Sequence, residues 1–262
     1  MGTSKSSTGP RGGVPLVPPW LEQPDKTGSP PPTSPTAPSH RLSSTKRAIS
    51  TALKDGDRDA VRRVLGNYVR NGYGGAKNAA ARMVQAPRTA SRAVSVLSGL
   101  ASGTASVEEL GFDPAALRGR SIEDVASAIA SAIQRTRITT DDSASQHAVS
   151  EALADLVSRD PNIDLLAPSP EQVEEAYILI LAYNTFEIFR LTVGKNIQDK
   201  AKDDYATSDR ILSEIRSTIV EVVRGEIKKI KNQELGINSA NAEIIGREAI
   251  AQTTQIFDGW IK

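Results

Sequence analysis

The distribution of proline constrains this chain more than any other feature of its sequence. Ten of its fifteen prolines lie within residues 1–40. Proline fixes φ, removes a backbone donor and restricts the residue before it, so repeated prolines exclude a helix from this stretch. The segment SPPPTSPTAP, Ser29 to Pro38, is typical of extended polyproline II backbone, and its PxxP spacing would also suit a Pro-rich ligand. We expect residues 1–42 to form a disordered Pro/Gly/Ser-rich arm that precedes any folded body.

From Ser43 onward the apolar residues recur with helical spacing, and no run alternates as a strand would. Ser44 and Thr45 suit the cap of a first helix, and Asp57 suits the start of a second. Ser169 is followed by Pro170 and then by Gln172, three residues after the cap, which is a strong helix start. The helix from there to about Lys200 is apolar nearly all round, which is typical of a buried central helix. The sequence therefore predicts an all-α fold of one or more bundle-like domains.

The net charge of +1 hides a strong asymmetry along the chain. Residues 41–92 carry a net charge of +9, whereas residues 93–262 carry −9. On composition and charge we predict an arm at 1–42, a basic helical segment at 43–103 and an acidic helical body at 104–262. Two explanations of the asymmetry stay open: the two parts attract each other within one fold, or the basic part meets an anionic partner.

The residue inventory argues against an enzyme. The chain has no cysteine, and its two histidines, His40 and His147, lie in different segments. Thiolate chemistry is therefore excluded, and His-based metal sites or nucleophile activation are disfavoured. No uncharged apolar stretch is long enough to span a membrane, and no secretory signal precedes the body. We expect a cytoplasmic protein that is not an enzyme, holds no metal and needs no cofactor.

The segment NGYGGAK, Asn71 to Lys77, raises the question of phosphate binding. Consecutive backbone amides at a helix start can bind phosphate, but the P-loop spacing is absent and no strand precedes the glycines. A tight turn between helices, which uses glycine for positive φ, is the favoured interpretation. The basic side chains around it could still contact nucleic-acid phosphates. These candidate contacts are Arg58, Arg62, Arg63, Arg70, Lys77 and Arg82.

The first twenty residues, MGTSKSSTGPRGGVPLVPPW, suggest a function for the arm. Because Gly2 is small, removal of Met1 is expected, and this would expose a glycine amine at the tip. Small hydroxyl residues follow, and then an apolar cluster that ends near Trp20. An arm with a small tip and an aromatic anchor suits insertion into a pocket of another protein.

Two segments together resemble a known family. They are this arm, with its MGTS start and its P-L-x-P-x-W pattern, and the segment AVRRVLGNYVRNGYGGAKNAAARM, Ala60 to Met83. Both are similar to the QatB component of bacterial Qat anti-phage defence systems. In such systems this component is encoded beside an ATPase, a QueC-like enzyme and a TatD-like nuclease. The resemblance implies a non-enzymatic defence protein that partners the QueC-like enzyme of the same operon, with the ATPase and the nuclease as further candidate partners.

The resemblance also implies a chemistry for the arm. QueC-type enzymes use ATP to build the nitrile of a deazaguanine base, so the Gly2 amine would attack the activated carboxylate of that base and become modified. Thr3 and Ser4 can hydrogen-bond through their hydroxyls inside a narrow pocket. The residues implied in partner binding are Gly2, Thr3, Ser4, Pro15, Leu16, Pro18 and Trp20. The alternative function is a helical nucleic-acid-binding module that acts through the basic segment 41–92.

Overall fold

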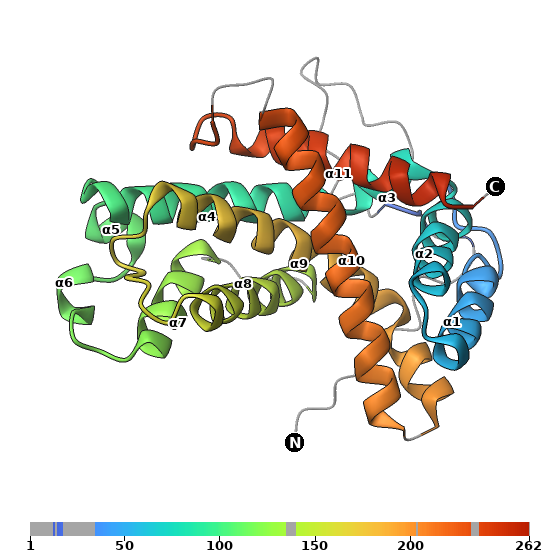
Figure 1. Ribbon diagram of the computed structural model, residues 1–262. Helices are drawn as coiled ribbons and strands as arrows, with labels where there is room; N and C mark the ends of the chain where they lie inside the picture. Colours follow the sequence, from blue (N-terminus) through green and yellow to red (C-terminus); the bar gives the residue numbers. More distant parts are fainter. Residues whose placement is uncertain are drawn as a thin grey trace, which may run out of the picture. The chain divides into compact units, whose positions relative to one another are not determined.

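The computed structural model describes Gly13 and residues 15–17, 35–134, 140–202, 204–231 and 236–261. These residues form an all-α fold, which confirms the predicted fold class, and they contain no strand beyond one isolated bridge (Figure 1). The elements are α1 (Ser43–Asp55), α2 (Arg58–Asn67), the π-helical turn η2 (Tyr68–Gly72), α3 (Ala76–Arg82), α4 (Gln85–Ser102), α5 (Val107–Leu110), α6 (Pro114–Leu117), α7 (Ile122–Ile133), α8 (Thr140–Arg159), α9 (Pro170–Ala201), α10 (Tyr205–Lys231) and α11 (Ala242–Gly259).

The chain divides into two compact units, each built from separate stretches of sequence. The first unit comprises Met1–Val84, Ile188–Glu221 and Ile250–Lys262, and the second comprises Gln85–Glu187 and Val222–Ala249. Their sequences carry opposite formal charges, because the first has 20 basic and 12 acidic residues, a net of +8, and the second has 12 and 19, a net of −7. These units follow contacts, whereas the boundaries predicted at residues 42 and 103 follow composition. The two divisions differ because α9, α10 and α11 each contribute residues to both units.

The first unit is organised around α1, α2 and an aromatic cluster. The Asp57 side chain accepts a hydrogen bond from the Ala60 amide at 2.6 Å, which makes Asp57 the predicted cap of α2. The predicted cap of α1 is wrong, since the helix begins at Ser43 after Leu42 and no side chain caps it. The Tyr68 ring packs edge-on against Tyr73 and Phe189, with centroids 5.2 and 4.9 Å apart.

Segments far apart in the sequence lie side by side in this unit. A Cβ at Gly66 in α2 would lie 2.5 Å from Ile261 Cγ1 and 2.9 Å from the Phe257 carbonyl oxygen. The absence of a side chain at Gly66 therefore lets α2 approach the end of α11, as Figure 1 shows for the blue-green and red helices.

The second unit contains α4 to α8 and most of α9. Ser169 and Gln172 cap α9 reciprocally: the Ser169 amide donates to Gln172 Oε1 at 2.8 Å, and the Gln172 amide donates to Ser169 Oγ at 3.3 Å. Ser121 caps α7 by accepting a hydrogen bond from the Asp124 amide at 3.1 Å. A further capping box joins Ser106 and Glu109 at α5.

The apolar surface of α9 is buried nearly all round, as its composition predicts. Each residue from Ala176 to Tyr183 is at most 5% exposed. Within the described part of the chain, α9 alone is long and apolar enough to cross a membrane, but 83% of its most apolar 18-residue window is buried inside the protein. We therefore interpret α9 as a buried core helix.

Candidate functional site

The described part of the arm pairs with the chain that leads into α1. The Gly13 amide donates to the Ala37 carbonyl and the Leu16 amide donates to the Pro35 carbonyl, both at 2.9 Å. Pro15 and Thr36 form an isolated antiparallel bridge between these two hydrogen bonds. We call the pairing of Gly13 and Pro15–Val17 with Pro35–Ala37 the arm anchor. It gives this stretch a fixed place, which the predicted disorder of residues 1–42 did not include.

Two apolar side chains of the arm anchor are buried in the first unit. Leu16 is 3% exposed and Val17 is 2% exposed. Val17 clusters with Val84, which lies just beyond the end of α3. Leu16 Cδ1 lies 4.0 Å from the place that a Cβ on Gly74 would take. Burial of an aliphatic side chain contributes about 1.5–3 kcal/mol, so these two residues are a substantial attachment for so short a segment.

A turn rich in glycine, Gly72 to Gly75, lies next to the arm anchor; we call it the glycine turn. Gly74 and Gly75 adopt φ values of +69° and +110°, which only glycine adopts easily, so the cluster is the inter-helix turn that the sequence favours. A Cβ on Gly72 would lie 3.2 Å from Leu42 Cδ2. Two apolar side chains therefore lie close to the turn: Leu16 of the arm anchor, near Gly74, and Leu42, near Gly72.

Arg41 attaches the segment before α1 to the glycine turn. Its buried guanidinium donates to the Gly72 carbonyl and lies 4.9 Å above the centre of the Tyr73 ring. The ring face supplies negative electrostatic potential to a cation that has lost most of its water. Arg41 thus holds the segment before α1 against η2 and the glycine turn.

The structure places the predicted arm residues in three groups. Gly2, Thr3, Ser4, Pro18 and Trp20 lie outside the described residues. The Pro15 side chain is exposed, whereas the Leu16 side chain faces the interior of its own unit. Their part in partner binding stays a prediction, and the burial of Leu16 gives that residue a structural role as well.

The predicted basic residues spread over α2, η2 and α3, and several have acidic neighbours in the first unit. Arg58 pairs with Glu221 at 2.8 Å, and Arg70 pairs with Asp258 at 3.1 Å. Both acidic partners are far away in sequence, which supports the explanation that parts of opposite charge attract each other within one fold.

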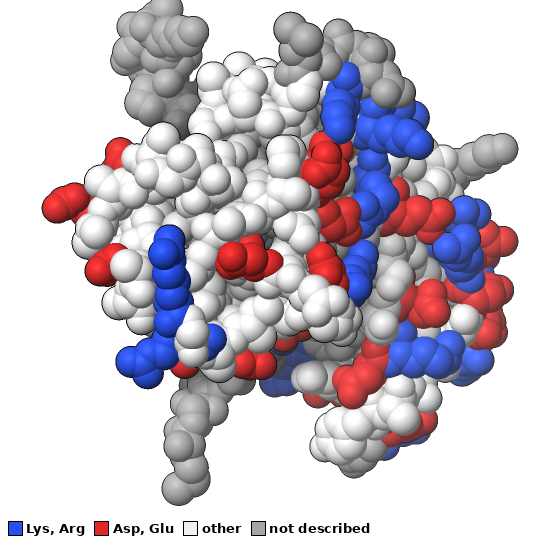
Figure 2. Space-filling view, turned by 60° about the vertical axis from the view of Figure 1, so that its left-hand side comes forward, with Lys and Arg blue, Asp and Glu red and all other residues white. Residues whose placement is uncertain are grey.

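The other members of the basic set differ in their surroundings. Arg62 pairs with Asp59 at 3.2 Å and lies 5.7 Å above the Trp260 ring. Arg63 and Lys77 are exposed, and Arg82 is half-buried. Figure 2 shows basic and acidic side chains interspersed on one face of the molecule rather than gathered by sign.

An ion-pair network in the second unit centres on Glu175. Its carboxylate accepts from both terminal nitrogens of Arg224, with Nη2 at 2.7 Å, and from Arg159 at 3.2 Å. The hydrogen bonds from Arg224 to this carboxylate raise the pKa of the guanidinium, which is already charged at any ordinary pH. The acidic residues at the start of α9 therefore act as ion-pair partners that hold α8 and α10 to it.

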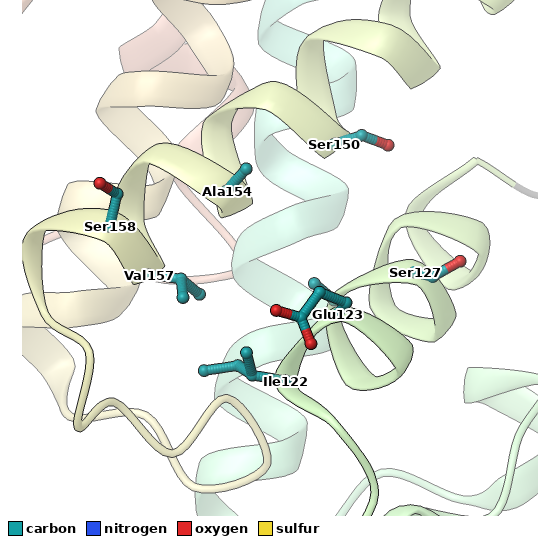
Figure 3. Close-up of a pocket in the computed structure, with 8 residues that line it drawn as sticks. Ile122, Glu123, Ser127, Ser150, Ala154, Val157 and Ser158 are labelled. Carbon is teal, nitrogen blue, oxygen red and sulfur yellow. The ribbon is translucent and has the colours of Figure 1, made fainter.

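A groove lies between α7 and α8 in the second unit. Its volume is about 360 Å³. Figure 3 shows Ile122 and Glu123 of α7 facing Ala154 and Val157 of α8 across it. Serines from both helices complete the lining, and Glu123 is its one charged residue. Across the described residues, no three His, Asp or Glu side chains gather to hold a metal ion.

Comparison of the chain with models of known protein families finds a match. The family model described as "QatB: Qat anti-phage system associated protein QatB" matches residues 74–257. The match begins in the glycine turn and covers α3 to α10 and most of α11, including parts of both units. No curated protein matches the chain, and no solved structure matches it.

Proposed function

The chain belongs to the QatB family of Qat anti-phage defence systems, and we propose that within such a system it is a non-enzymatic protein whose N-terminal arm is modified at Gly2. Membership of the system makes its other proteins the partners of this chain. In the proposal, the first partner is a QueC-like ATP-dependent enzyme of the same operon. The system's ATPase and TatD-like nuclease are further proposed partners, and the cytoplasm is the proposed location.

The proposed reaction joins the arm to a deazaguanine-type base. Removal of Met1 exposes the Gly2 amine, which attacks the carboxyl carbon that the partner enzyme has activated with ATP. The activating group leaves, the nitrogen loses a proton, and an amide bond remains between the base and the arm. Glycine suits this role because its amine carries no neighbouring side chain to obstruct a narrow pocket. A protein that serves as the substrate needs no catalytic group of its own.

The observation that carries the proposal is the arm anchor. Leu16 and Val17 are buried and the Gly13 amide donates to the Ala37 carbonyl, so the chain is attached to the first unit at Gly13 and at these two side chains. A segment that is attached at one end and ends in a small amine suits delivery to the active site of another protein. The folded helices then serve as the body that the partner recognises.

The intact mass of the protein tests the proposal. We expect an added mass on the N-terminal peptide when the protein is expressed with its operon neighbours, and none when it is expressed alone or without the QueC-like enzyme. The substitution Gly2→Pro should abolish the addition, whereas Gly9→Ala, a matched change within the arm, should retain it. Deletion of residues 2–8 should also abolish protection from phage while the helical body stays folded. An unmodified Gly2 in the presence of every operon protein would contradict the proposal.

The charge of the first unit supports nucleic-acid binding as a second candidate function. Its net charge is +8, and Arg63 and Lys77 are exposed on it. Each phosphate contact should add about −0.9 to the slope of log binding constant against log salt on duplex DNA. Charge reversal at Arg63 and Lys77 should reduce that slope. Absence of DNA and RNA binding at low salt would refute this function and leave the first proposal untouched.

A further inference from the structure

We propose that Arg41, Thr45 and the first turn of α1 form a binding site for a small oxyanion, a carboxylate or a phosphate. We call these residues the Arg41 site. It lies in the first unit beside the glycine turn, and it is independent of any modification of Gly2. Arg41 is also outside the set of basic residues that the sequence suggests for contacts with nucleic acid.

The Arg41 guanidinium leaves one of its edges without a partner. Its Nη1 donates to the Gly72 carbonyl, and the ring of Tyr73 lies 4.9 Å from its central carbon. Its Nε and Nη2 are buried and have no hydrogen-bond partner in the part of the chain that the structure describes. The N–H groups of these two nitrogens point in parallel along one edge, which is an edge that arginine uses to bind both oxygens of a carboxylate or phosphate. The guanidinium is therefore fixed by one end and one face, and its bidentate edge remains for another group.

Thr45 supplies a second buried donor. Its side chain is fully buried, and its Oγ1 also has no hydrogen-bond partner among the described residues. Other threonines in the helices donate to the carbonyl four residues earlier, as Thr192 does to Ile188 at 2.9 Å. A buried hydroxyl or guanidinium nitrogen without a partner is costly, so an acceptor at this place would stabilise the fold.

The start of α1 lies at the same place. A Cβ on Gly72 would be 3.2 Å from Leu42, and the Gly72 carbonyl accepts from Arg41, so the guanidinium lies where α1 begins. This helix of 13 residues packs against η2, has no side-chain cap and has no acidic residue in its first turn. Its first amides and the positive end of its dipole therefore also favour an anion there.

The surrounding sequence supplies no counter-ion to Arg41. The stretch from Arg41 to Lys54 contains four basic residues and no acidic residue, and the first unit carries a net charge of +8. A buried cation without an anion strongly destabilises a fold, and the face of Tyr73 compensates only part of that cost. A bound oxyanion would neutralise the guanidinium and satisfy its free edge at once.

The burial of these groups limits the size of the ligand. Arg41 is 6% exposed and Thr45 is 0% exposed, so the approach to their donors is narrow. A single carboxylate or phosphate group with two oxygens for the guanidinium edge meets this condition. The phosphates of a nucleic-acid duplex do not, because they are part of a wide polymer that stays on a protein surface.

Unfolding of the full-length protein in urea tests the site through stability. The measurement is made in sodium chloride with added sodium phosphate or sodium acetate at constant ionic strength. The unfolding equilibrium constant should fall by about a hundredfold when the binding anion reaches about 100 times its dissociation constant. Arg41→Met should lose this saturable effect, whereas the general influence of a salt on stability acts on both proteins. An equal response of the two proteins to phosphate and to acetate would overturn the site.

The Nε–H signal of Arg41 in NMR, assigned by its loss in Arg41→Met, identifies the anion. A saturable change with phosphate alone assigns a phosphate site, and one with acetate assigns a carboxylate site. Thr45→Val should weaken binding by about tenfold, since it removes a hydrogen bond to a charged group. Thr51→Val, the same substitution on the same helix, is the matched control and should bind as the unsubstituted protein does, because the Thr51 hydroxyl bonds to the Arg47 carbonyl.

Native mass spectrometry before the titration reveals an anion that has co-purified with the protein. Such an anion on the unsubstituted protein, absent from Arg41→Met, would support the site. No co-purified anion together with an Nε–H signal that neither phosphate nor acetate changes would overturn it. A change caused by duplex DNA and by neither small anion would also overturn it, and would favour the nucleic-acid function instead.

Discussion

The close packing around Gly246 in the second unit predicts that Gly246→Ala destabilises the protein although alanine is the better helix former. A Cβ at this position would lie 2.8 Å from Tyr177 Oη, 3.1 Å from Pro87 Cβ and 3.2 Å from Pro87 Cα. The Tyr177 hydroxyl donates to the Ala242 carbonyl at 2.8 Å in a buried hydrogen bond. The new methyl group must therefore displace either this hydroxyl or the proline.

The magnitude follows from three contributions. Replacing glycine by alanine inside a helix stabilises by about 1 kcal/mol. Overpacking of a well-filled site costs about 1–3 kcal/mol, and a buried hydroxyl without its partner costs about 1–3 kcal/mol more. The costs exceed the gain, so Gly246→Ala should lower the free energy of unfolding by about 3 kcal/mol.

Urea unfolding followed by circular dichroism measures this change, and Gly225→Ala in α10 is the matched control. Apart from its chain neighbours and the nearby backbone of α10, no atom of the described residues lies within 4 Å of a Cβ at Gly225, so helix propensity alone should act there. We expect the control to gain about 0.5–1 kcal/mol. If Gly246→Ala were as stable as the control, the close approach of α11 to Tyr177 and Pro87 would be refuted.

Three further predictions concern pH, ion pairing and capping. Burial raises the pKa of Tyr177 above its ordinary value near 10, so the folded protein retains a proton that the unfolded chain releases. The contribution of Tyr177 to the free energy of unfolding should be fully present below pH 10 and fall above it by about 1.4 kcal/mol per pH unit. Tyr177→Phe should remove that part of the pH dependence, as measured by urea unfolding between about pH 9 and 11.5. Glu175→Gln should cost about 1 kcal/mol at low salt because Arg224 loses its bidentate partner, and a double-mutant cycle with Arg224→Met should show positive coupling that weakens in 0.5 M NaCl. Asp57→Ala should cost about 1 kcal/mol while Asp57→Asn costs much less, and equal melting temperatures for the two variants would contradict the capping role.

Much of the fold could be predicted from local sequence, because helix starts depend on groups a few residues apart. Asp57 and Ser169 each cap the helix that the sequence assigns to them. The box of Ser106 and Glu109 carries an S-x-x-E signal of the same kind as Ser169 and Gln172, and it could have been found from that signal. The start of α1 was misplaced because Ser44 and Thr45 lie inside a helix whose first turn has no side-chain cap.

The candidate site could be predicted less well, because it depends on contacts between distant residues. No local pattern shows that Leu16 pairs with Pro35 or that its side chain lies near Gly74. Prolines lower the propensity for regular structure, and only tertiary packing reveals that a short Pro-rich stretch is held in place. The charge asymmetry was visible in the sequence, but the pairing of Arg70 with Asp258 required the fold.

The shared helices have a consequence for how this protein is made. The first unit needs residues 250–261, because α2 packs against Phe257 and Ile261 through Gly66. Ribosomes add roughly 5–20 residues per second, so these residues are synthesised about 10–40 s after α2. During that interval the apolar face of α2 cannot yet pack against Phe257 and Ile261. The first unit is therefore complete only after residues 250–261 have been synthesised, although its longest stretch, Met1–Val84, is made first.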